Sequence, residues 1–294
     1  MELKKVGWIG TGVMGKSMCG HIIEKGHETY VYNRTKEKTK PLVDKGAVYI
    51  GSVSEIAKKC DIVFTIVGFP HDVEETYFGN GGIIENIREG GVVVDMTTST
   101  PNLAESIYAK AKDKGIFALD APVSGGDIGA REAKLAIMVG GDENIFQAAM
   151  PFFSAMGQNI RLMGSCGKGQ HTKMSNQILV AGNMIGAVES LLYAYKAGLD
   201  LTDVIEVIGK GAAASWTINQ LGPRIAKNDF EPGFYIKHFI KDMGIALDEC
   251  KRMKLSLPGL SLVNQFYIAA SALGFENQGT QGLYNVLKVM NKVL

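Results

Sequence analysis

The first half of the chain alternates short apolar runs with longer segments in which apolar residues recur every three or four positions. Apolar runs bounded by glycine and polar residues are typical of buried strands, and the segments between them are typical of amphipathic helices. The predicted strands are residues 5–10, 28–33, 47–50, 61–67, 91–95, 116–119, 134–139 and 158–162. Strands that alternate with helices predict an α/β fold with a doubly wound, Rossmann-type parallel sheet.

The pattern changes beyond residue 164, where only helical periodicity remains. The Pro-free run 166–197 would be about 45 Å long as one helix, at 1.5 Å per residue. Further helices are predicted at residues 202–209, 215–225, 236–254, 260–273 and 280–292. We therefore predict two domains. Residues 1–163 form the α/β domain, and residues 164–294 form an all-helical C-terminal domain that begins with a long interdomain helix.

Composition narrows the class of protein. With 46% hydrophobic and 21% charged residues, the 294-residue chain resembles an ordinary soluble globular protein. A formal net charge of +1 gives no reason to expect nucleic acid or an anionic membrane as a partner. The four cysteines form no CxxC pair, which suits a reducing compartment. No signal peptide is evident, and the longest uncharged run, residues 255–275, contains proline, glycine and amides, so we expect buried helices and a cytoplasmic protein.

A glycine motif follows the first predicted strand and opens a predicted helix. It reads Gly10-Thr11-Gly12-Val13-Met14-Gly15, a GxGxxG. The first glycine permits a tight turn, the second lets the backbone approach a pyrophosphate, and the third lets helix and strand pack closely. The helix N-terminus can then hold the phosphates. Because the motif stands between a strand and a helix, it predicts a dinucleotide-binding loop.

The second predicted strand ends without the acidic residue that holds the ribose of NAD. That acid is expected about 20 residues past the glycines, but the chain reads Asn33-Arg34-Thr35, followed by Lys36 and Lys38. A carboxylate would repel a 2′-phosphate, whereas an arginine can pair with it through two hydrogen bonds. We therefore predict NADP(H) in preference to NAD(H). A solvated helix start would explain the same cations.

Three further strand ends are expected at the ligand-binding edge of the sheet, because doubly wound sheets bind ligands at the carboxyl ends of their strands. They are residues 67–70, which include Val67 and Gly68, residues 96–99, which include Thr98, and residues 120–126. In the last of these, Ser124 offers a hydroxyl, and Gly125 and Gly126 offer backbone N–H groups suited to a carboxylate. A tight turn that requires positive φ is the alternative explanation for the two glycines.

The long predicted helix opens with Gly169-Gln-His-Thr-Lys-Met-Ser-Asn-Gln177. Residues three or four apart share a helix face, so Lys173, Asn176 and Gln177 can point into one cleft. A lysine beside amides can donate a proton to a carbonyl oxygen or accept one from an alcohol. A solvated surface lysine is the alternative. There is no HExxH motif and no dense Cys/His cluster, so we predict no metal.

Together these motifs resemble the β-hydroxyacid dehydrogenase family, which includes 3-hydroxyisobutyrate dehydrogenase, tartronate semialdehyde reductase and the glyoxylate/succinic semialdehyde reductases. Four motifs carry the resemblance in the expected order over essentially the whole chain: residues 10–15, 120–126, 169–177, and Lys241-Asp242 after residues 230–234. The resemblance implies a Rossmann domain followed by a helical substrate and dimerisation domain, and transfer of a hydride between NADP(H) and a small semialdehyde or 3-hydroxy acid.

The resemblance also implies roles for individual residues. Lys173 is implied as the catalytic acid/base, the residues around Ser124 hold the substrate carboxylate, and Phe234 and Asp242 close the site from the helical domain. The implied substrate-binding residues are Ser124, Gly125, Gly126, Asn176, Gln177, Phe234 and Asp242. The implied cofactor-binding residues are Gly10, Thr11, Gly12, Val13, Met14, Gly15, Asn33, Arg34, Thr35, Val67, Gly68, Thr98 and Lys241.

The resemblance leaves three questions open. The Asn33-Arg34-Thr35 segment is similar to the NADP-preferring, semialdehyde-reducing members and departs from the NAD-using hydroxyisobutyrate enzymes, which tend to carry an acid there. An imine reductase shares the architecture but usually replaces the lysine, and a catalytically idle dinucleotide-binding scaffold is expected to lose it. The substrate is predicted only as a carboxylate-bearing aldehyde or hydroxy acid, and the protein as a homo-oligomer, a dimer or a tetramer.

Overall fold

The computed structural model describes residues 3–293. The chain divides into two compact units, one up to Lys173 and the other from Met174 onward. This division lies inside the longest helix, α9 (Lys168–Lys196). The sequence predicts the domain boundary between residues 163 and 164, before that helix, and this boundary stays a prediction.

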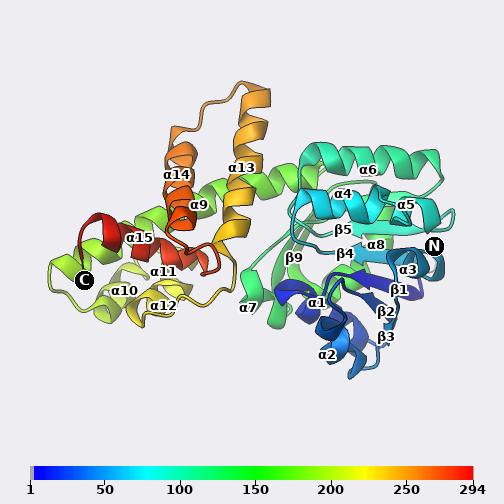
Figure 1. The fold of residues 1–294 in the computed structure, drawn as a ribbon, viewed down its shortest axis with the longest axis horizontal. Helices are drawn as coiled ribbons and strands as arrows, with labels where there is room; N and C mark the ends of the chain where they lie inside the picture. Colours follow the sequence, from blue (N-terminus) through cyan, green and yellow to red (C-terminus); the bar gives the residue numbers. More distant parts are fainter. Residues whose placement is uncertain (1–2, 294) are drawn as a thin grey trace. The chain divides into compact units, whose positions relative to one another are not determined.

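A six-stranded sheet forms the centre of the first unit (Figure 1). Its strands are β1 (Lys5–Ile9), β2 (Glu28–Tyr32), β3 (Val48–Tyr49), β4 (Ile62–Thr65), β5 (Val92–Asp95) and β6 (Phe117–Asp120). They lie in the order β3-β2-β1-β4-β5-β6, and every neighbouring pair is parallel. This is the doubly wound Rossmann order, and it confirms the predicted fold class. The order reverses between β1 and β4, where such sheets bind their ligands.

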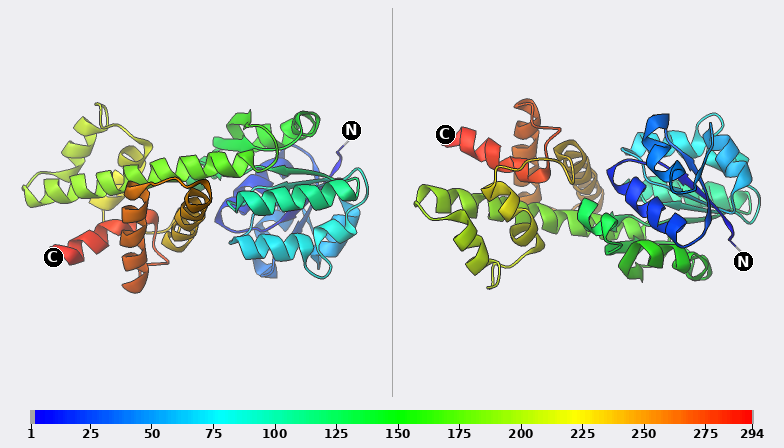
Figure 2. Two further views of the ribbon diagram at one scale, coloured as in Figure 1. Left: turned by 90° about the horizontal axis from the view of Figure 1, so that it is seen from above. Right: turned by 90° about the horizontal axis from the view of Figure 1, so that it is seen from below.

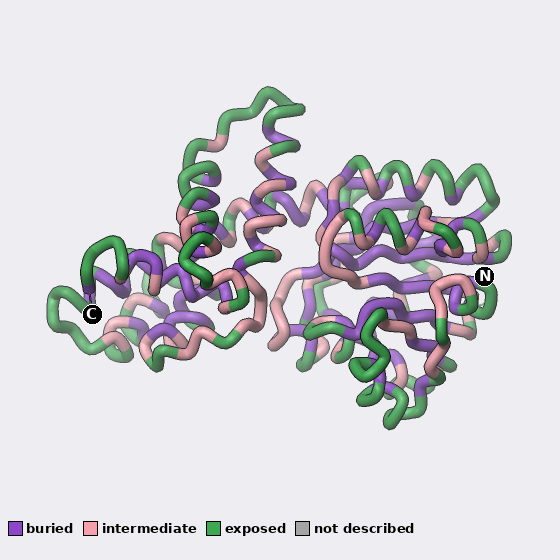
Figure 3. Tube along the Cα trace, viewed as in Figure 1, coloured by how far each residue is buried: buried purple, intermediate pink, exposed green. Residues whose placement is uncertain are grey.

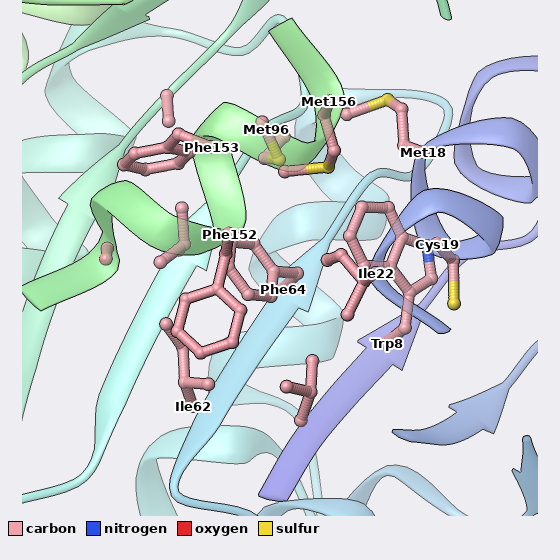
Figure 4. Close-up of a cluster of buried hydrophobic side chains, with 14 of the residues drawn as sticks. Trp8, Met18, Cys19, Ile22, Ile62, Phe64, Met96, Phe152, Phe153 and Met156 are labelled. Atoms are coloured by element: carbon pink, nitrogen blue, oxygen red, sulfur yellow. The ribbon is translucent and has the colours of Figure 1, made fainter. Parts of the chain in front are cut away.

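Helices cover both faces of this sheet. Successive residues of a strand point to opposite sides, so each face of the sheet has side chains that pack on a layer of helices. The first face, with Trp8 and Phe64, packs against α1 (Val13–Glu24) and α8 (Glu143–Met156). Figure 4 shows this core, in which the rings of Trp8 and Phe64 stack at 5.4 Å and Phe152 of α8 packs on Phe64. The second face packs against α3 (Val53–Lys59), α4 (Pro70–Phe78), α5 (Ile83–Asn86) and α6 (Pro101–Asp113) (Figure 2). Figure 3 shows the buried backbone of β1, β4 and β5 between these layers.

The last strands form a sheet of their own, which differs from the single sheet that the strand pattern suggests. β7 (Val123–Ser124), β8 (Leu135–Val139) and β9 (Gly157–Leu162) lie in the order β7-β8-β9, and β7 runs antiparallel to β8. One bridge, between Asp120 and Gly140, links β6 to this second sheet. Pro122 stands two residues past the end of β6 and has no N–H with which to continue a ladder. A six-residue helix, α7 (Gly126–Arg131), connects β7 to β8.

The second unit is helical, as predicted. After α9 it contains α10 (Leu201–Ile208), α11 (Trp216–Gln220), α12 (Gly222–Ala226), α13 (Ile236–Met253), α14 (Pro258–Ala272) and α15 (Leu283–Met290). The single helix predicted at residues 215–225 is two helices, because Pro223 lacks an N–H and begins a new helix after Leu221. Buried apolar residues from these helices, among them Met184, Phe239 and Tyr267, form one core.

By length and composition alone, α9 could cross a membrane: it has 29 residues and a mean hydropathy of 1.4 over its most apolar window, 39% of which is buried. This is weak support for a span, since core helices of soluble proteins have the same properties. Its first turns pack in the α/β unit, where Gln170 is fully buried and Asp120 holds the helix end.

Candidate functional site

The glycine loop after β1 has the geometry that dinucleotide binding requires. Gly10 has φ of 96°, and a Cβ there would lie 2.1 Å from the carbonyl oxygen of Ile66. A Cβ on Gly15 would lie 2.1 Å from the carbonyl oxygen of Gly10. A Cβ on Gly12, in contrast, would meet nothing within 4 Å. Gly10 and Gly15 therefore allow close packing, and Gly12 leaves open space where a pyrophosphate can approach.

The N-terminus of α1 is suited to an anion. No side chain caps it, and its first turn contains no acidic residue. The Thr11 side chain is 3% exposed, and its hydroxyl has no hydrogen-bond partner among residues 3–293. The backbone N–H of Thr11 donates to Asn33 Oδ1 at 3.0 Å and so ties the loop to the end of β2. The loop fits the diphosphate of a dinucleotide, which the helix N-terminus would attract.

Arg34 stands at the end of β2 with its side chain in solvent. The side chain is 86% exposed, and Nη1 lies 3.5 Å from Asp72 Oδ1 of α4. An exposed ion pair of this length contributes little to stability. The guanidinium can therefore turn to a phosphate at small cost, and Thr35 follows it at the start of a short basic segment.

A buried polar network joins the ends of β4 and β5. Thr65 Oγ1 donates to Asp95 Oδ1 at 2.9 Å and lies 3.1 Å from the hydroxyl of Tyr77. The backbone N–H of Thr97 also donates to Asp95 Oδ1, at 3.1 Å. In turn, the backbone N–H of Val67 donates to Thr97 Oγ1 at 3.0 Å. The loop that contains Val67 and Gly68 is thereby fixed to the loop that contains Thr98, which is half-buried.

Asp95 should make stability depend on pH. Burial raises the pKa of this carboxyl from 3.8 to about 6, against hydrogen bonds from Thr97 and Thr65 that lower it. Because the folded state binds the proton more tightly than the unfolded state, stability is lost as pH rises from about 4 to about 6 and then stays level. Asp95→Asn removes this titration. We expect the free energy of unfolding of the variant, relative to the unmodified protein, to increase by up to about 3 kcal/mol between pH 4 and pH 8.

Denaturant unfolding of both proteins at the two pH values measures this change. Any effect of the amide on stability that does not depend on pH cancels when the two pH values are compared. If the stability difference between the variant and the unmodified protein is the same at both pH values, the pKa of Asp95 is not raised.

The segment after β6 forms a tight turn with two glycines in positive φ. Gly125 has φ of 132° and Gly126 has φ of 63°. A Cβ on Gly126 would meet nothing within 4 Å, so its backbone is open to a ligand. Ser124 is half-buried in β7, opposite Ala136. Positive φ explains why glycine is needed here, and the open space is compatible with anion binding; Asp127 in the first turn of α7 is paired with Arg131.

Asp120, at the end of β6, holds the N-terminus of α9. Its carboxylate accepts hydrogen bonds from the backbone N–H groups of Gly167 and Gln170, each at 2.8 Å. These are groups that a helix end leaves without intrahelical partners. Burial raises the pKa of Asp120, and the backbone hydrogen bonds oppose that rise. A carboxylate distant in the sequence thus fixes the start of the helix that carries Lys173.

Lys173 is not a solvated surface lysine, because it is only 6% exposed. Next along the helix, Asn176 Nδ2 donates to Gln177 Oε1 at 2.7 Å. Gln177 Nε2 donates to Asp242 Oδ2 of α13 at 2.6 Å, and Lys241 Nζ lies 2.9 Å from Asp242 Oδ1. Four predicted site residues of the helical unit are therefore joined in one polar chain around a carboxylate that is 1% exposed.

Phe234 lies outside this chain. It precedes α13, is half-buried, and its ring lies 5.6 Å from that of Phe239. Of the predicted residues, the glycine loop, Asn33, Arg34, Thr35, Val67, Gly68, Thr98, Ser124, Gly125, Gly126 and Lys173 belong to the first unit. Asn176, Gln177, Phe234, Lys241 and Asp242 belong to the second.

Sequence reasoning missed the residues that hold the site together. They are Asp95, Thr97, Asp120 and Gln170, all less than 5% exposed. Two signals were present: a carboxylate at the last position of an apolar strand, and a glutamine inside the motif that contains Lys173. Within residues 3–293, no three His, Cys, Asp or Glu side chains are grouped so that they could hold a metal ion.

Comparison with known proteins agrees with this geometry. Residues 5–164 match the family model of the NAD-binding domain of 6-phosphogluconate dehydrogenase. Residues 167–287 match the NAD-binding model of NADP-dependent 3-hydroxyisobutyrate dehydrogenase. The chain is 54% identical over 283 residues to an uncharacterized oxidoreductase of Bacillus subtilis (strain 168), covering 96% of this chain and 98% of the relative. It is 36% identical over 286 residues to the 2-hydroxy-3-oxopropionate reductase of Escherichia coli (strain K12), covering 97% and 98%.

A solved structure is similar over the same length. The 3-hydroxyisobutyrate dehydrogenase of Mycobacterium tuberculosis, determined with L-serine, has a TM-score of 0.86 and 27% identity, covering 98% of this chain and 100% of that one. The fold and the glycine loop thus define an NAD(P)-dependent hydroxyacid dehydrogenase of the 3-hydroxyisobutyrate dehydrogenase and tartronate semialdehyde reductase type. The chain belongs to the β-hydroxyacid dehydrogenase family.

Proposed function

We propose that this protein reduces a small carboxylate-bearing aldehyde to the corresponding hydroxy acid with NADPH, and that Lys173 is the general acid. The observation that carries the proposal is the burial of Lys173, which is 6% exposed in the first turns of α9. A lysine that serves only solubility has no reason to be buried, because desolvation of an ammonium group is costly. A buried lysine next to a dinucleotide-binding fold therefore supports a role in proton transfer.

Bound NADPH would supply the hydride that reduces the aldehyde carbon. The chain's own contribution is to bind and orient the aldehyde and to provide the proton. As the carbonyl oxygen gains negative charge, the Lys173 ammonium stabilises it and then donates a proton to it. The unperturbed pKa of a lysine side chain is about 10.4, and in its protonated form the side chain is ready to act in the direction of reduction.

Binding of the substrate is assigned to two groups of residues. Ser124 and the open backbone of Gly125 and Gly126 are proposed to hold the carboxylate. Asn176 is proposed to place the aldehyde, with Gln177 held in position by its hydrogen bond to the buried Asp242. Phe234 is proposed to exclude water. The relative from Escherichia coli, named a 2-hydroxy-3-oxopropionate reductase, and the structural relative determined with L-serine support a small carboxylate-bearing substrate.

The carboxylate requirement can be tested with a matched pair of aldehydes. NADPH consumption is measured with succinic semialdehyde and with butanal, which has the same chain length but no carboxylate. We expect kcat/KM to be at least about 100-fold higher for the semialdehyde, as expected for charge-assisted hydrogen bonds to the carboxylate. Equal values for the two aldehydes would contradict the assignment of Ser124 and the two glycines.

NADP(H) is proposed as the preferred cofactor. The glycine loop, Thr98 and Lys241 are proposed to contact it, and the exposed Arg34 and the adjacent Thr35 are proposed to hold its 2′-phosphate. Support comes from the end of β2, where Asn33 holds the loop, an arginine follows, and no carboxylate stands in the position that would bind a ribose.

Arg34→Gln should weaken use of NADPH without affecting use of NADH. We expect KM for NADPH to rise about 10- to 100-fold, because a charged hydrogen-bonding partner of the phosphate is lost. Steady-state kinetics with both cofactors measures this, and Lys58→Gln, at another exposed position, is the control for loss of one positive charge. A parallel change for both cofactors, or no change, would contradict the role of Arg34.

A homo-oligomeric state and a cytoplasmic location are also proposed. The helical unit exposes several large apolar side chains, including Leu179 at 66%, Tyr193 at 76% and Val207 at 74%, which supports association of subunits.

A further inference from the structure

The side chain of Gln170 forms an unusual connection inside the α/β unit. It is 0% exposed. Its Oε1 accepts from the backbone N–H of Ser99 at 3.0 Å, and its Nε2 donates to the backbone carbonyl of Thr97 at 2.8 Å. These two backbone groups flank Thr98, so both ends of the amide are used to hold that residue's main chain. The connection joins α9 to the loop after β5, more than 70 positions earlier in the chain.

The backbone of Gln170 is fixed as well. Its N–H donates to Asp120 Oδ2 at 2.8 Å, which anchors the first turn of α9 on the end of β6. Thr97 is fixed from the other side, because its N–H donates to Asp95 and its hydroxyl accepts from Val67. The ends of β4, β5 and β6 and the start of α9 therefore form one hydrogen-bonded frame.

Lys173 is one helical turn beyond Gln170. A helix advances about 1.5 Å per residue and is stiff over one turn. Whatever fixes Gln170 therefore also fixes the backbone from which the Lys173 side chain extends. The frame sets the distance between that backbone and the loop that carries Thr98.

We propose that Gln170 is a positioning residue for the reaction: by binding the backbone on both sides of Thr98, it holds the helix of Lys173 in register with the loop that contains Thr98, a proposed contact of the cofactor. This inference rests on the proposed function, in which Lys173 donates the proton. Proton and hydride transfer to one carbonyl group require both donors to be aligned, and a displacement of about 1 Å can cost about 100-fold in rate.

A purely structural role is the competing explanation, because buried backbone groups need partners wherever they lie. The two roles predict different kinetics. Loss of a structural contact lowers the amount of folded enzyme or weakens cofactor binding. Loss of alignment lowers kcat in the folded, cofactor-bound enzyme and makes hydride transfer more rate-limiting.

The test compares Gln170→Met with the unmodified enzyme. Methionine has a similar length and removes both hydrogen bonds while filling the space. Gln147→Met, at an exposed position of α8, is the matched control. For each protein we measure kcat, KM for the semialdehyde, Kd for NADPH, and the kinetic isotope effect with NADPH deuterated at the transferred position. We also measure hydrogen exchange of the segment 97–99.

For Gln170→Met we expect kcat to fall about 100-fold, with a larger isotope effect and faster exchange at Ser99. Kd for NADPH should stay close to that of the control. An unchanged kcat, or a fall in kcat matched by weaker NADPH binding, would overturn the inference. Absence of semialdehyde turnover in the unmodified enzyme would instead overturn the proposed function, and this inference with it.

A second variant tests whether lost activity comes from misfolding, because it can restore the two hydrogen bonds. In Gln170→Glu, a protonated carboxyl can still accept from Ser99 and donate to Thr97, whereas an ionised carboxylate cannot donate. The titratable groups in the same hydrogen-bonded frame are Asp120, which accepts from the backbone N–H of residue 170, and Asp95, which accepts from the backbone N–H of Thr97. Lys173 follows three residues later in α9, and all three groups are common to both proteins. At each pH, we divide the kcat of Gln170→Glu by the kcat of the unmodified enzyme. We expect this ratio to rise as pH falls, because the protonated carboxyl restores both hydrogen bonds. A ratio that is independent of pH and near one would overturn the inference.

Discussion

Replacing Lys173 with alanine is expected to lower kcat for a semialdehyde by about 10³- to 10⁴-fold. The variant loses the proton donor and the positive charge that stabilises the developing oxyanion, and each effect is large in a site that excludes water. Lys173 is 6% exposed, so few water molecules are available to replace it. Binding of NADPH should be nearly unchanged, because Lys173 is proposed to act on the substrate and not on the cofactor.

Single-turnover rates and NADPH titration separate these effects. Lys168→Ala, at the exposed first position of the same helix, is the control and should behave like the unmodified enzyme. If Lys173→Ala loses NADPH binding, the lysine holds the cofactor and its proposed role is wrong. If it retains full turnover, the proton comes from another group.

Gly169→Ala should be the most destabilising of the single-methyl substitutions in α9. A Cβ at this position would lie 2.4 Å from the carbonyl oxygen of Met138 and 2.7 Å from both the carbonyl oxygen and Oδ2 of Asp120. The first two contacts are with backbone, and the third is with a carboxylate that is 2% exposed and holds the helix end. Because Met138 is paired within β8 and Asp120 binds the start of α9, neither can move without loss of hydrogen bonds, and we expect a loss of at least about 3 kcal/mol in the free energy of unfolding.

Gly182→Ala in the same helix is the matched control. A Cβ there would meet nothing within 4 Å, and alanine forms helices better than glycine by about 1 kcal/mol. We expect this variant to be as stable as the unmodified protein or slightly more stable. Denaturant unfolding of the two variants measures the contrast, and equal stabilities would show that the start of α9 can shift to accommodate a methyl group.

The contrast between these two glycines illustrates what the sequence can and cannot predict. The apolar runs predicted all six strands of the Rossmann sheet, because each run is bounded by polar or glycine residues. The glycine loop was predictable because its three glycines are adjacent in the chain. β8 and β9 were predicted as strands, but their separation into a sheet with β7 was not predictable, because β7 has only two residues and its pairing with β8 depends on the turn at Gly125 and on α7 between them.

The hydrogen-bonded frame of the site could not be predicted from the sequence, for a similar reason. Asp120 meets the start of α9 across 47 to 50 positions of the chain, and Gln170 meets the loop after β5 across 71 to 73 positions. Periodicity describes neighbours three or four residues apart and carries no information on such contacts. The sequence placed Lys173 on a helix face with Asn176 and Gln177, but only the structure shows that the lysine is buried and that Asp242 holds Gln177.

The most direct test measures NADPH oxidation with glyoxylate, succinic semialdehyde, tartronate semialdehyde, methylmalonate semialdehyde and sulfolactaldehyde, each repeated with NADH. We expect fast turnover of at least one of these aldehydes, with NADPH well ahead of NADH. Equal rates with the two cofactors would contradict the role of Arg34 but not the proposed reduction of a carboxylate-bearing aldehyde. No turnover of any of them, with NADPH still bound, would contradict a semialdehyde reductase and favour an imine reductase or a non-catalytic dinucleotide-binding protein.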